Sequence, residues 1–87
     1  MIINYLYNPT MKYKAELSSL LVAVGRNVKR LRLEKGLTQQ DLAFECDMDK
    51  STVSNIERFN LDNITIGTLV KMCLILECDL ISLFKIL

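Results

Sequence analysis

Apolar residues recur at intervals of three and four along the first third of the chain, which is the spacing of one face of an α-helix. The positions are Leu17, Leu20, Leu21, Val24, Val28 and Leu31. They predict helical structure from Met11 to Lys35, either as one helix or as two helices divided at Gly25, with Gly36 as the stop signal. Residues 1–10 contain the only proline and show no period, so we expect an irregular arm there.

The next stretch has the pattern of two short helices joined by a tight turn. Thr38 precedes a helical run and Asp41 follows three residues later, which is the spacing of a capping box. Leu42 and Cys46 form one apolar stripe, and the small residue Ala43 beside them allows a second helix to cross closely. We therefore expect the first helix of the pair to begin just after Thr38.

The second helix of the pair is predicted after a turn at Asp47, because aspartate enters the left-handed conformation at little cost. Asp49 is the expected N-cap of this helix, which runs from Lys50 to Arg58. Val53 and Ile56 face inward on it. Its polar residues are therefore expected on the outer face.

Two further helices are predicted in the last third of the chain. Thr65 is the expected N-cap of the first, whose inner positions are Ile66, Leu69, Val70, Cys73 and Leu76. Asp79 is the expected N-cap of the second, from Leu80 to Leu87. Since no segment shows the alternation of a β-strand, the predicted fold class is all-α, with five or six helices around one core.

Composition excludes several kinds of protein. With 87 residues, 51% hydrophobic content and no long run of proline, glycine or serine, the chain has room for one compact domain. Its apolar stretches fall short of the ~20 residues that span a bilayer. The N-terminus lacks the basic and small residues of a signal peptide. We therefore expect a cytoplasmic protein that does not enter a membrane.

The cysteines argue against disulfide and metal chemistry. Cys46, Cys73 and Cys78 lie at apolar helical positions, and the chain has no histidine. An odd number of cysteines does not fit a disulfide framework, and these residues cannot build a structural zinc site or an imidazole base. We interpret all three as core thiols and expect no metal, no cofactor and no small-molecule substrate. Enzymatic function is the poorest interpretation, because an oriented nucleophile and a phosphate-binding glycine loop are also missing.

Charge is polarised along the chain, although its net value is only +1. Residues 12–35 hold seven basic and two acidic side chains, or +5, and residues 36–87 hold four basic and eight acidic side chains, or −4. A basic first helix favours contact with phosphate, and a solvated helix face is the alternative.

Three motifs resemble the Xre/Cro-type helix-turn-helix family of bacterial and phage repressors. They are LRLEKG at residues 31–36, TQQDLA at residues 38–43 and SNIER at residues 54–58. Within that family the chain is most similar to the small controller proteins of restriction-modification systems. The resemblance covers about residues 24–84 and implies a lambda-repressor-like bundle that binds double-stranded DNA. Without it, the helix pair would equally fit packing in any small helical bundle.

The resemblance also implies a division of the chain. Residues 1–22 are an N-terminal arm and helical extension that the family does not explain. Residues 23–87 are the helix-turn-helix DNA-binding domain with a C-terminal dimerisation helix.

Base readout requires hydrogen-bonding side chains on the early, exposed turns of the helix that enters the major groove. Lys50, Ser51, Thr52 and Asn55 meet this requirement, and the resemblance places base contacts at the same outward positions. Thr52 has a second interpretation, in which it completes the helix cap with Asp49. For all four, an ordinary solvated helix face is the alternative.

Phosphate contacts usually come from a helix N-terminus and its flanking donors. Gln39 is the best candidate, since a glutamine at this place contacts phosphate in related repressors. Gln40 beside it, Arg30 on the basic first helix and Asn60 in the loop after the second helix of the pair are further candidates. That loop departs from the family pattern, because Phe59, Leu61 and Asp62 stand where relatives often carry glycine and a basic residue. The departure weakens its expected contribution to DNA affinity.

The resemblance implies two structural contacts as well. An arginine of the first helix meets a glutamate near the end of the reading helix in family members, so Arg32 and Glu57 are the expected structural ion pair. The C-terminal helix has more apolar faces than one small core can cover, which indicates a partner. The resemblance implies a homodimer through this end, and a simply buried terminal helix is the alternative. Candidate interface residues are Leu76, Ile81, Phe84 and Leu87.

Two functional hypotheses follow. The first is a homodimeric, sequence-specific transcription regulator that binds a pseudo-palindromic operator, most similar to controllers of restriction-modification systems acting on their own operators. The second is an antitoxin-like protein whose main task is to bind a partner protein, with DNA binding as autoregulation.

Overall fold

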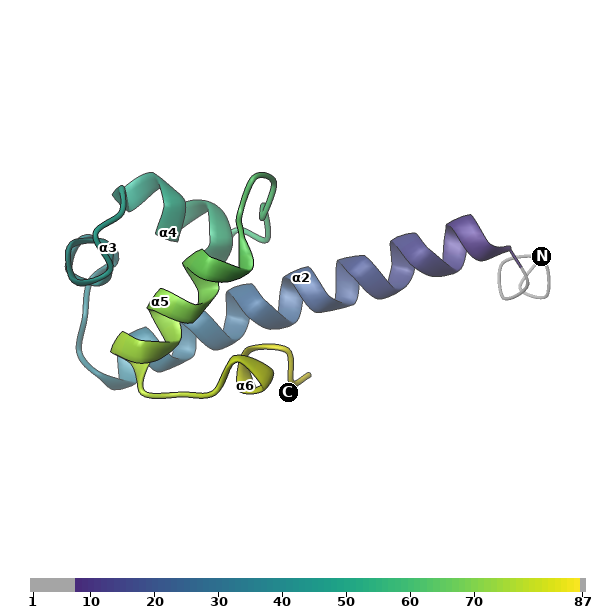
Figure 1. Ribbon diagram of the computed structural model, residues 1–87. Coiled ribbons are helices and arrows are strands. Elements are labelled where there is room, and N and C mark those ends of the chain that lie inside the picture. The colour runs from purple at the N-terminus through teal and green to yellow at the C-terminus, as the bar shows by residue number, and fades with distance from the viewer. Residues whose placement is uncertain (1–7, 87) are drawn as a thin grey trace.

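The computed structural model describes residues 8–86, and within that range the chain is built from five α-helices and no strand (Figure 1). The helices are α2 (Pro9–Glu34), α3 (Gln39–Glu45), α4 (Lys50–Glu57), α5 (Ile66–Leu76) and α6 (Leu80–Leu83). The all-α prediction is confirmed. None of these helices is long and apolar enough to cross a membrane.

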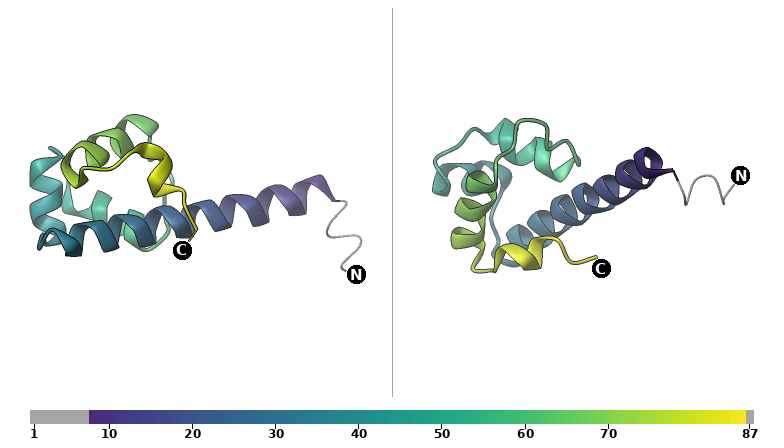
Figure 2. Two further views of the ribbon diagram at one scale, coloured as in Figure 1. Left: turned by 90° about the horizontal axis from the view of Figure 1, so that it is seen from below. Right: turned by 45° about the vertical axis from the view of Figure 1, so that its right-hand side comes forward.

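One hydrophobic core joins the C-terminal half of α2 to the four shorter helices. Its buried members are Val24, Val28, Leu42, Ala43, Cys46, Val53, Ile56, Leu69, Met72, Cys73, Leu76 and Leu83. α3 and α4 cross on one side of α2, and α5 and α6 close the core on another side (Figure 2). The core therefore fixes the α3–α4 pair against a long helix.

α2 is one continuous helix, so of the two alternatives the chain adopts the one without a division at Gly25. A Cβ atom at Gly25 would lie 2.5 Å from the carbonyl oxygen of Ile56 and 2.6 Å from the ring of Phe59. The glycine is needed because α4 and the loop after it approach α2 closely, and not because the helix breaks. Gly36, with φ +70, follows the end of α2 as expected.

The helix also begins earlier than its apolar period indicates. Asn8 is the N-cap, and its side-chain oxygen accepts hydrogen bonds from the backbone N–H groups of Thr10 and Met11 at 3.0 and 3.2 Å. Pro9 occupies the first helical position, where proline is favoured. Pro9 and Thr10 are therefore helical, and the rest of the predicted irregular arm, residues 1–7, lies outside the described residues.

The N-terminal part of α2 extends beyond the body of the molecule (Figures 1 and 2). Residues 9–20, called the projecting segment below, are all exposed except the half-buried Ala15. Twelve helical residues correspond to about 18 Å of length. The described part of the chain measures 46 × 23 × 18 Å for this reason.

α5 and α6 differ from their predicted forms. The Thr65 cap is confirmed, since its hydroxyl accepts from the Thr68 N–H at 3.1 Å. Ile66 and Val70, expected inside, are 60% and 41% exposed, and Met72 is fully buried. α6 ends at Leu83, four residues before its predicted end.

A buried asparagine explains the early end of α6. The side-chain amide of Asn27 on α2 is fully buried and lies 3.2, 2.9 and 2.8 Å from the carbonyl oxygens of Ser82, Leu83 and Lys85. These carbonyls are at or beyond the end of a helix, where backbone carbonyls lack their regular intrahelical donors, and among the three only that of Ser82 also accepts from a nearby backbone N–H in the described residues. Asn27 thus supplies the donor and holds the C-terminal segment on α2.

Candidate nucleic-acid interface

The start of α3 has the predicted capping box. The Thr38 hydroxyl accepts from the Asp41 N–H at 3.0 Å, and the Thr38 N–H donates to the Asp41 carboxylate at 2.9 Å. The backbone hydrogen bond from Thr38 lowers the pKa of Asp41. The exposed side chains of Thr38 and Asp41 are therefore both engaged at the start of the helix. The other polar side chains on the first turn of α3 are those of Gln39 and Gln40.

The turn between α3 and α4 is also as predicted. Asp47 has φ +53, and the next N–H, of Met48, donates to the Ala43 carbonyl at 2.9 Å. Ala43 is fully buried where the two helices cross. Asp49 occupies the N-cap of α4, but its side chain makes no capping hydrogen bond.

The outer face of α4 presents the four predicted base-reading residues. Lys50 and Ser51 are exposed, whereas Thr52 and Asn55 are half-buried. The Thr52 N–H donates to the Asp49 carbonyl at 3.0 Å, so the backbone and not the Thr52 side chain completes the cap. The opposite face is fully buried through Val53 and Ile56. α4 therefore has one polar face available to a ligand.

Arg58 lies on the same face, although it was not predicted from the sequence as part of it. Its guanidinium donates to the side-chain oxygen of Asn55 at 2.6 Å. Ser51, Asn55 and Arg58 are spaced four and three residues apart, which is the signal that could have identified it. Asn55 keeps its amide nitrogen for another partner, because only its oxygen is engaged by Arg58.

An ion pair fixes α4 relative to α2. Arg32 Nε and Nη2 lie 2.7 and 2.9 Å from the two carboxylate oxygens of Glu57, and Nη1 lies 2.7 Å from the Leu37 carbonyl. The side chains are only 8% and 4% exposed. The hydrogen bond to Glu57 raises the pKa of Arg32. The structure thus contains the predicted pair in bidentate form, the strongest geometry for these groups.

The four candidate phosphate contacts lie in different settings. Gln39 is half-buried and donates to Glu57 at 3.2 Å, whereas Gln40 is exposed. Both line a shallow hollow with Lys50 between the end of α2 and the start of α3. Arg30 and Asn60 do not line it. Arg30 pairs with Glu34 at 3.1 Å, and the Asn60 oxygen accepts from the Asp62 N–H at 3.3 Å.

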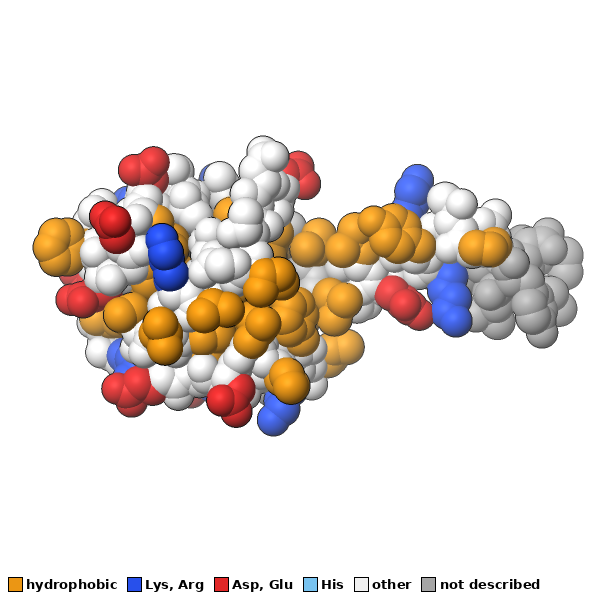
Figure 3. All heavy atoms as spheres, in the orientation of Figure 1, with side chains coloured by type: hydrophobic (Ala, Val, Ile, Leu, Met, Phe, Trp, Pro, Cys, Tyr) orange, Lys and Arg blue, Asp and Glu red, His pale blue; other side chains and the backbone are white. Residues whose placement is uncertain are grey.

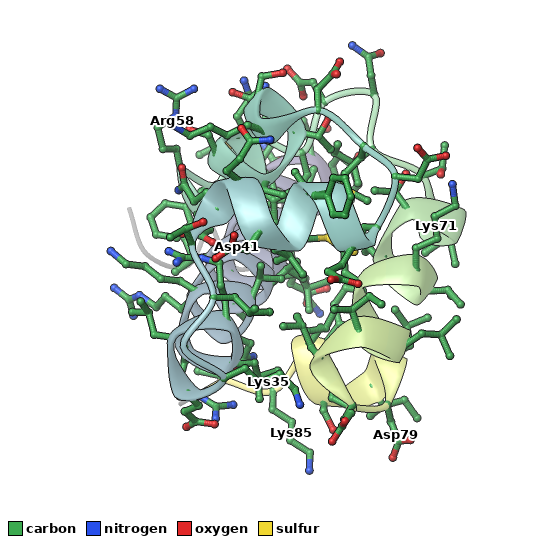
Figure 4. The ribbon with its side chains drawn as sticks, turned by 90° about the vertical axis from the view of Figure 1, so that its left-hand side faces the viewer. Lys35, Asp41, Arg58, Lys71, Asp79 and Lys85 are labelled. Atoms are coloured by element: carbon green, nitrogen blue, oxygen red, sulfur yellow. The ribbon has the colours of Figure 1, made fainter. Side chains whose placement is uncertain are left out.

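Figure 4, in which α3 runs across the middle of the view, shows how these parts are distributed. Asp41 on α3 and Arg58 after α4 lie on one side of the molecule, and Lys71 on α5 lies on the other. The α3–α4 pair is therefore exposed on the side away from α5.

The cysteines are buried or half-buried thiols. Burial raises the pKa of Cys46 and, together with the neighbouring Cys78 thiol, raises the pKa of Cys73 to about 12. Cys46 and Cys73 are therefore protonated at neutral pH, as core thiols are. Within residues 8–86 no cluster of acidic and cysteine side chains is suited to a metal ion.

The predicted subunit contacts are only partly on the surface. Leu76 is 2% exposed inside the core of a single chain and presents no surface to a partner, whereas Phe84 is half-buried against that core and presents only part of its side chain. Ile81 is 75% exposed, and Leu87 lies outside the described residues. The exposed apolar residues of this region are instead Ile66, Val70, Leu74 and Ile81, called the α5–α6 face below.

A family model described as helix-turn-helix matches residues 28–83, which contain the α3–α4 pair, the ion pair and every buried member of the core except Val24. The chain belongs to the helix-turn-helix family. Members of this family are DNA-binding transcription regulators and not enzymes. Family membership therefore agrees with the Xre-type resemblance of the sequence.

Several members of the helix-turn-helix family are similar to this chain. The control protein C.BamHI of Bacillus amyloliquefaciens is 38% identical over an alignment 52 residues long, and this alignment covers 54% of this chain and 64% of that protein. The structure of the restriction-modification controller C.AhdI from Aeromonas hydrophila is 34% identical with a TM-score of 0.67, covering 74% of this chain and 96% of that one. A variant of the controller C.Esp1396I is 42% identical with a TM-score of 0.68, covering 77% and 88%.

Proposed function

We propose that the protein is a homodimeric, sequence-specific transcription regulator that controls a restriction-modification system from a pseudo-palindromic operator beside its own gene. The observation that carries this proposal is the polar outer face of α4, held by a buried ion pair within a helix-turn-helix domain. The names of the similar controller proteins support the biological assignment. These comparisons do not favour the antitoxin-like alternative. A regulator of this kind acts in the cytoplasm, where its operator is accessible.

Base recognition is assigned to the outer face of α4. Lys50 is a donor suited to guanine O6 and N7, and Asn55 presents its free amide to adenine or to a phosphate. Ser51 and Thr52 contribute hydroxyl groups on the first turn, where side chains of an inserted helix reach base edges. Arg58 is added to this set because its charge lies on the same face.

Phosphate contact is assigned first to Gln39 and Gln40 on the opening turn of α3, with Arg30 and Asn60 as flanking candidates. The positive end of the helix dipole favours a phosphate there. Gln39 donates one amide N–H to Glu57 and keeps the other for a phosphate, whereas the side chain of Gln40 is exposed.

The α5–α6 face is the proposed contact of the homodimer. Ile66, Val70 and Leu74 follow at intervals of four along α5, and Ile81 adds to them from α6. Contiguous apolar surface of this kind marks an interaction site. A two-fold contact would place two reading helices about 34 Å apart, the distance of successive major grooves.

The test is selection of bound fragments from random duplex DNA by the purified protein, followed by titration of the winners at several salt concentrations. We expect an enriched pseudo-palindrome whose half-sites are about one helical turn apart, with affinity that falls as salt rises. Absence of any enriched sequence, with only weak salt-sensitive binding, would overturn the proposal.

A further inference from the structure

The projecting segment has an apolar stripe that no described part of the chain covers. Tyr13, Leu17 and Leu20 follow at intervals of four and three residues and are 63%, 38% and 40% exposed. Four residues further on, Val24 continues the stripe but is 1% exposed, because there the core covers it. The same helix face is therefore buried in one half of α2 and bare in the other.

Local interactions define the start of this helix far from the body. Asn8 caps it and Pro9 opens it, so the sequence encodes helix in the projecting segment without help from the core. The projecting segment continues from the packed half of α2, so it needs no nucleus of its own, but most helical stability in proteins comes from packing of an apolar face. The stripe is therefore an apolar packing surface that has no partner among the described residues.

Exposed apolar residues connect this stripe to the α5–α6 face. Ile86 is 74% exposed and lines a shallow hollow together with Ala15 and Leu20 of α2. Ile81 follows on α6 and Leu74 on α5, at 75% and 74% exposure. Figure 3 shows hydrophobic side chains over α5, α6 and the projecting part of α2 on one face of the molecule. The stripe is thus continuous with the proposed dimer contact.

We propose that the projecting segment packs on a second copy of this chain and enlarges the homodimer contact of the α5–α6 face. This inference rests on the homodimer of the proposed function. Spacing of four and three residues is typical of helices that pack on another helix, and the exposed side of α5 offers one in the partner. In a two-fold dimer each of the two projecting segments contacts the other subunit, so the contact occurs twice and a substitution in the segment acts twice.

Charge also suits a second copy. Lys14 lies on the projecting segment and Asp79 lies at the turn between α5 and α6. Neither forms an ion pair within residues 8–86. The projecting segment therefore offers a cation and the turn beside the proposed contact offers a carboxylate, while Lys71 on α5 adds a positive charge to the same region.

The decisive variant is Leu17→Asp, with Ser18→Asp as its matched control. Both place one carboxylate in the exposed helix, but Ser18 lies on a different side of α2, about 100° around the helix axis from Leu17. We expect Leu17→Asp to raise the dimer dissociation constant about 100-fold, since a charge is buried twice, and Ser18→Asp to leave it within about threefold. Analytical ultracentrifugation gives the constants, and circular dichroism checks that both variants fold.

A second measurement needs no variant in the segment. Amide hydrogen exchange of residues 9–20 should slow as the wild-type concentration rises through the dimer dissociation constant, because only the dimer protects this helix. The same amides should exchange quickly at every concentration in Leu74→Asp, which blocks the α5–α6 face. Rapid exchange in wild-type dimers would overturn the inference.

The outcomes separate the two proposals. If Leu74→Asp dissociates the dimer while Leu17→Asp leaves it intact, or if both aspartates on α2 weaken it equally, the inference about the projecting segment is wrong and the homodimer stands. If the wild-type protein is a monomer at all concentrations, the homodimer of the proposed function fails first.

Discussion

At the scale of single residues, the Arg32–Glu57 pair has the largest expected energetic effect. It takes two full charges out of water and compensates them with two short hydrogen bonds, and the Leu37 carbonyl satisfies a further guanidinium N–H. Removal of one partner leaves the other charge buried and unpaired, which costs far more than the loss of an exposed pair.

Replacement of Arg32 by alanine should therefore lower the free energy of unfolding by about 3–5 kcal/mol. Arg30→Ala is the control, because the Arg30–Glu34 pair is exposed and should contribute less than about 1 kcal/mol. Urea titration followed by circular dichroism measures both. Similar small losses in the two variants would contradict a structural role for the buried pair.

Asn27 provides a second prediction, with a defined pH dependence. Asn27→Asp keeps the shape of the side chain but replaces its donor by a carboxylate that faces three carbonyl oxygens. We expect a loss of more than about 3 kcal/mol at pH 7. The new carboxyl must be protonated to donate, so its pKa should be raised in the folded state, and stability should recover as the pH falls below that value.

Thermal melts between neutral and acid pH measure the effect in Asn27→Asp and in the wild type. A variant that loses stability equally at every pH would show that the side-chain oxygen does not face these carbonyls.

Residues whose partners are near in sequence were predictable, and residues whose partners are distant were not. The Thr38–Asp41 capping box and the turn at Asp47 depend on neighbours within four residues. Asn27 donates to carbonyls 55 to 58 positions away, so nothing in its surroundings along the chain distinguished it. Arg32 and Glu57 are 25 residues apart and were identified only through the family resemblance.

At the scale of helices, the sequence predicted where the helices lie along the chain better than it predicted which side of each helix faces the core. α5 is apolar on nearly every side, so periodicity could not decide that Met72 points inward while Ile66 and Leu74 point outward. Because the last residues are apolar on several sides too, the predicted last helix ran to the end of the chain, whereas α6 ends at Leu83. Polar helices such as α4 were oriented correctly, because two apolar residues among many polar ones fix a face.

The outer face of α4 leads to a prediction about specificity. Asn55→Ala should reduce affinity for the selected operator by about 1–3 kcal/mol and relax the preference at one base position. Gln40→Ala is the comparison, since loss of a phosphate contact should weaken binding equally on all sequences. Competition assays with operators that differ at single positions distinguish the two patterns. A uniform loss in Asn55→Ala would place this residue on the DNA backbone.

At the scale of the whole molecule, the exposed apolar positions that we propose as the subunit contact differ in part from those that the sequence indicated, since only Ile81 belongs to both sets. Leu74→Asp should give folded monomers, because the side chain is 74% exposed on the α5–α6 face. Phe84→Asp should instead lower the melting temperature, because Phe84 packs against the core. Sedimentation velocity and thermal melts together measure these outcomes. A dimeric Leu74→Asp protein would move the contact to another surface.

The close approach at Gly25 has a consequence for the evolution of DNA specificity. A side chain at this position would act as a wedge between α2 and the end of α4, since its first carbon would already lie 2.5 Å from the Ile56 carbonyl. The wedge would tilt the reading helix relative to the subunit that carries it. We expect such a tilt to change the preferred distance between operator half-sites. Position 25 would then select among operators while every side chain that meets the bases stays the same.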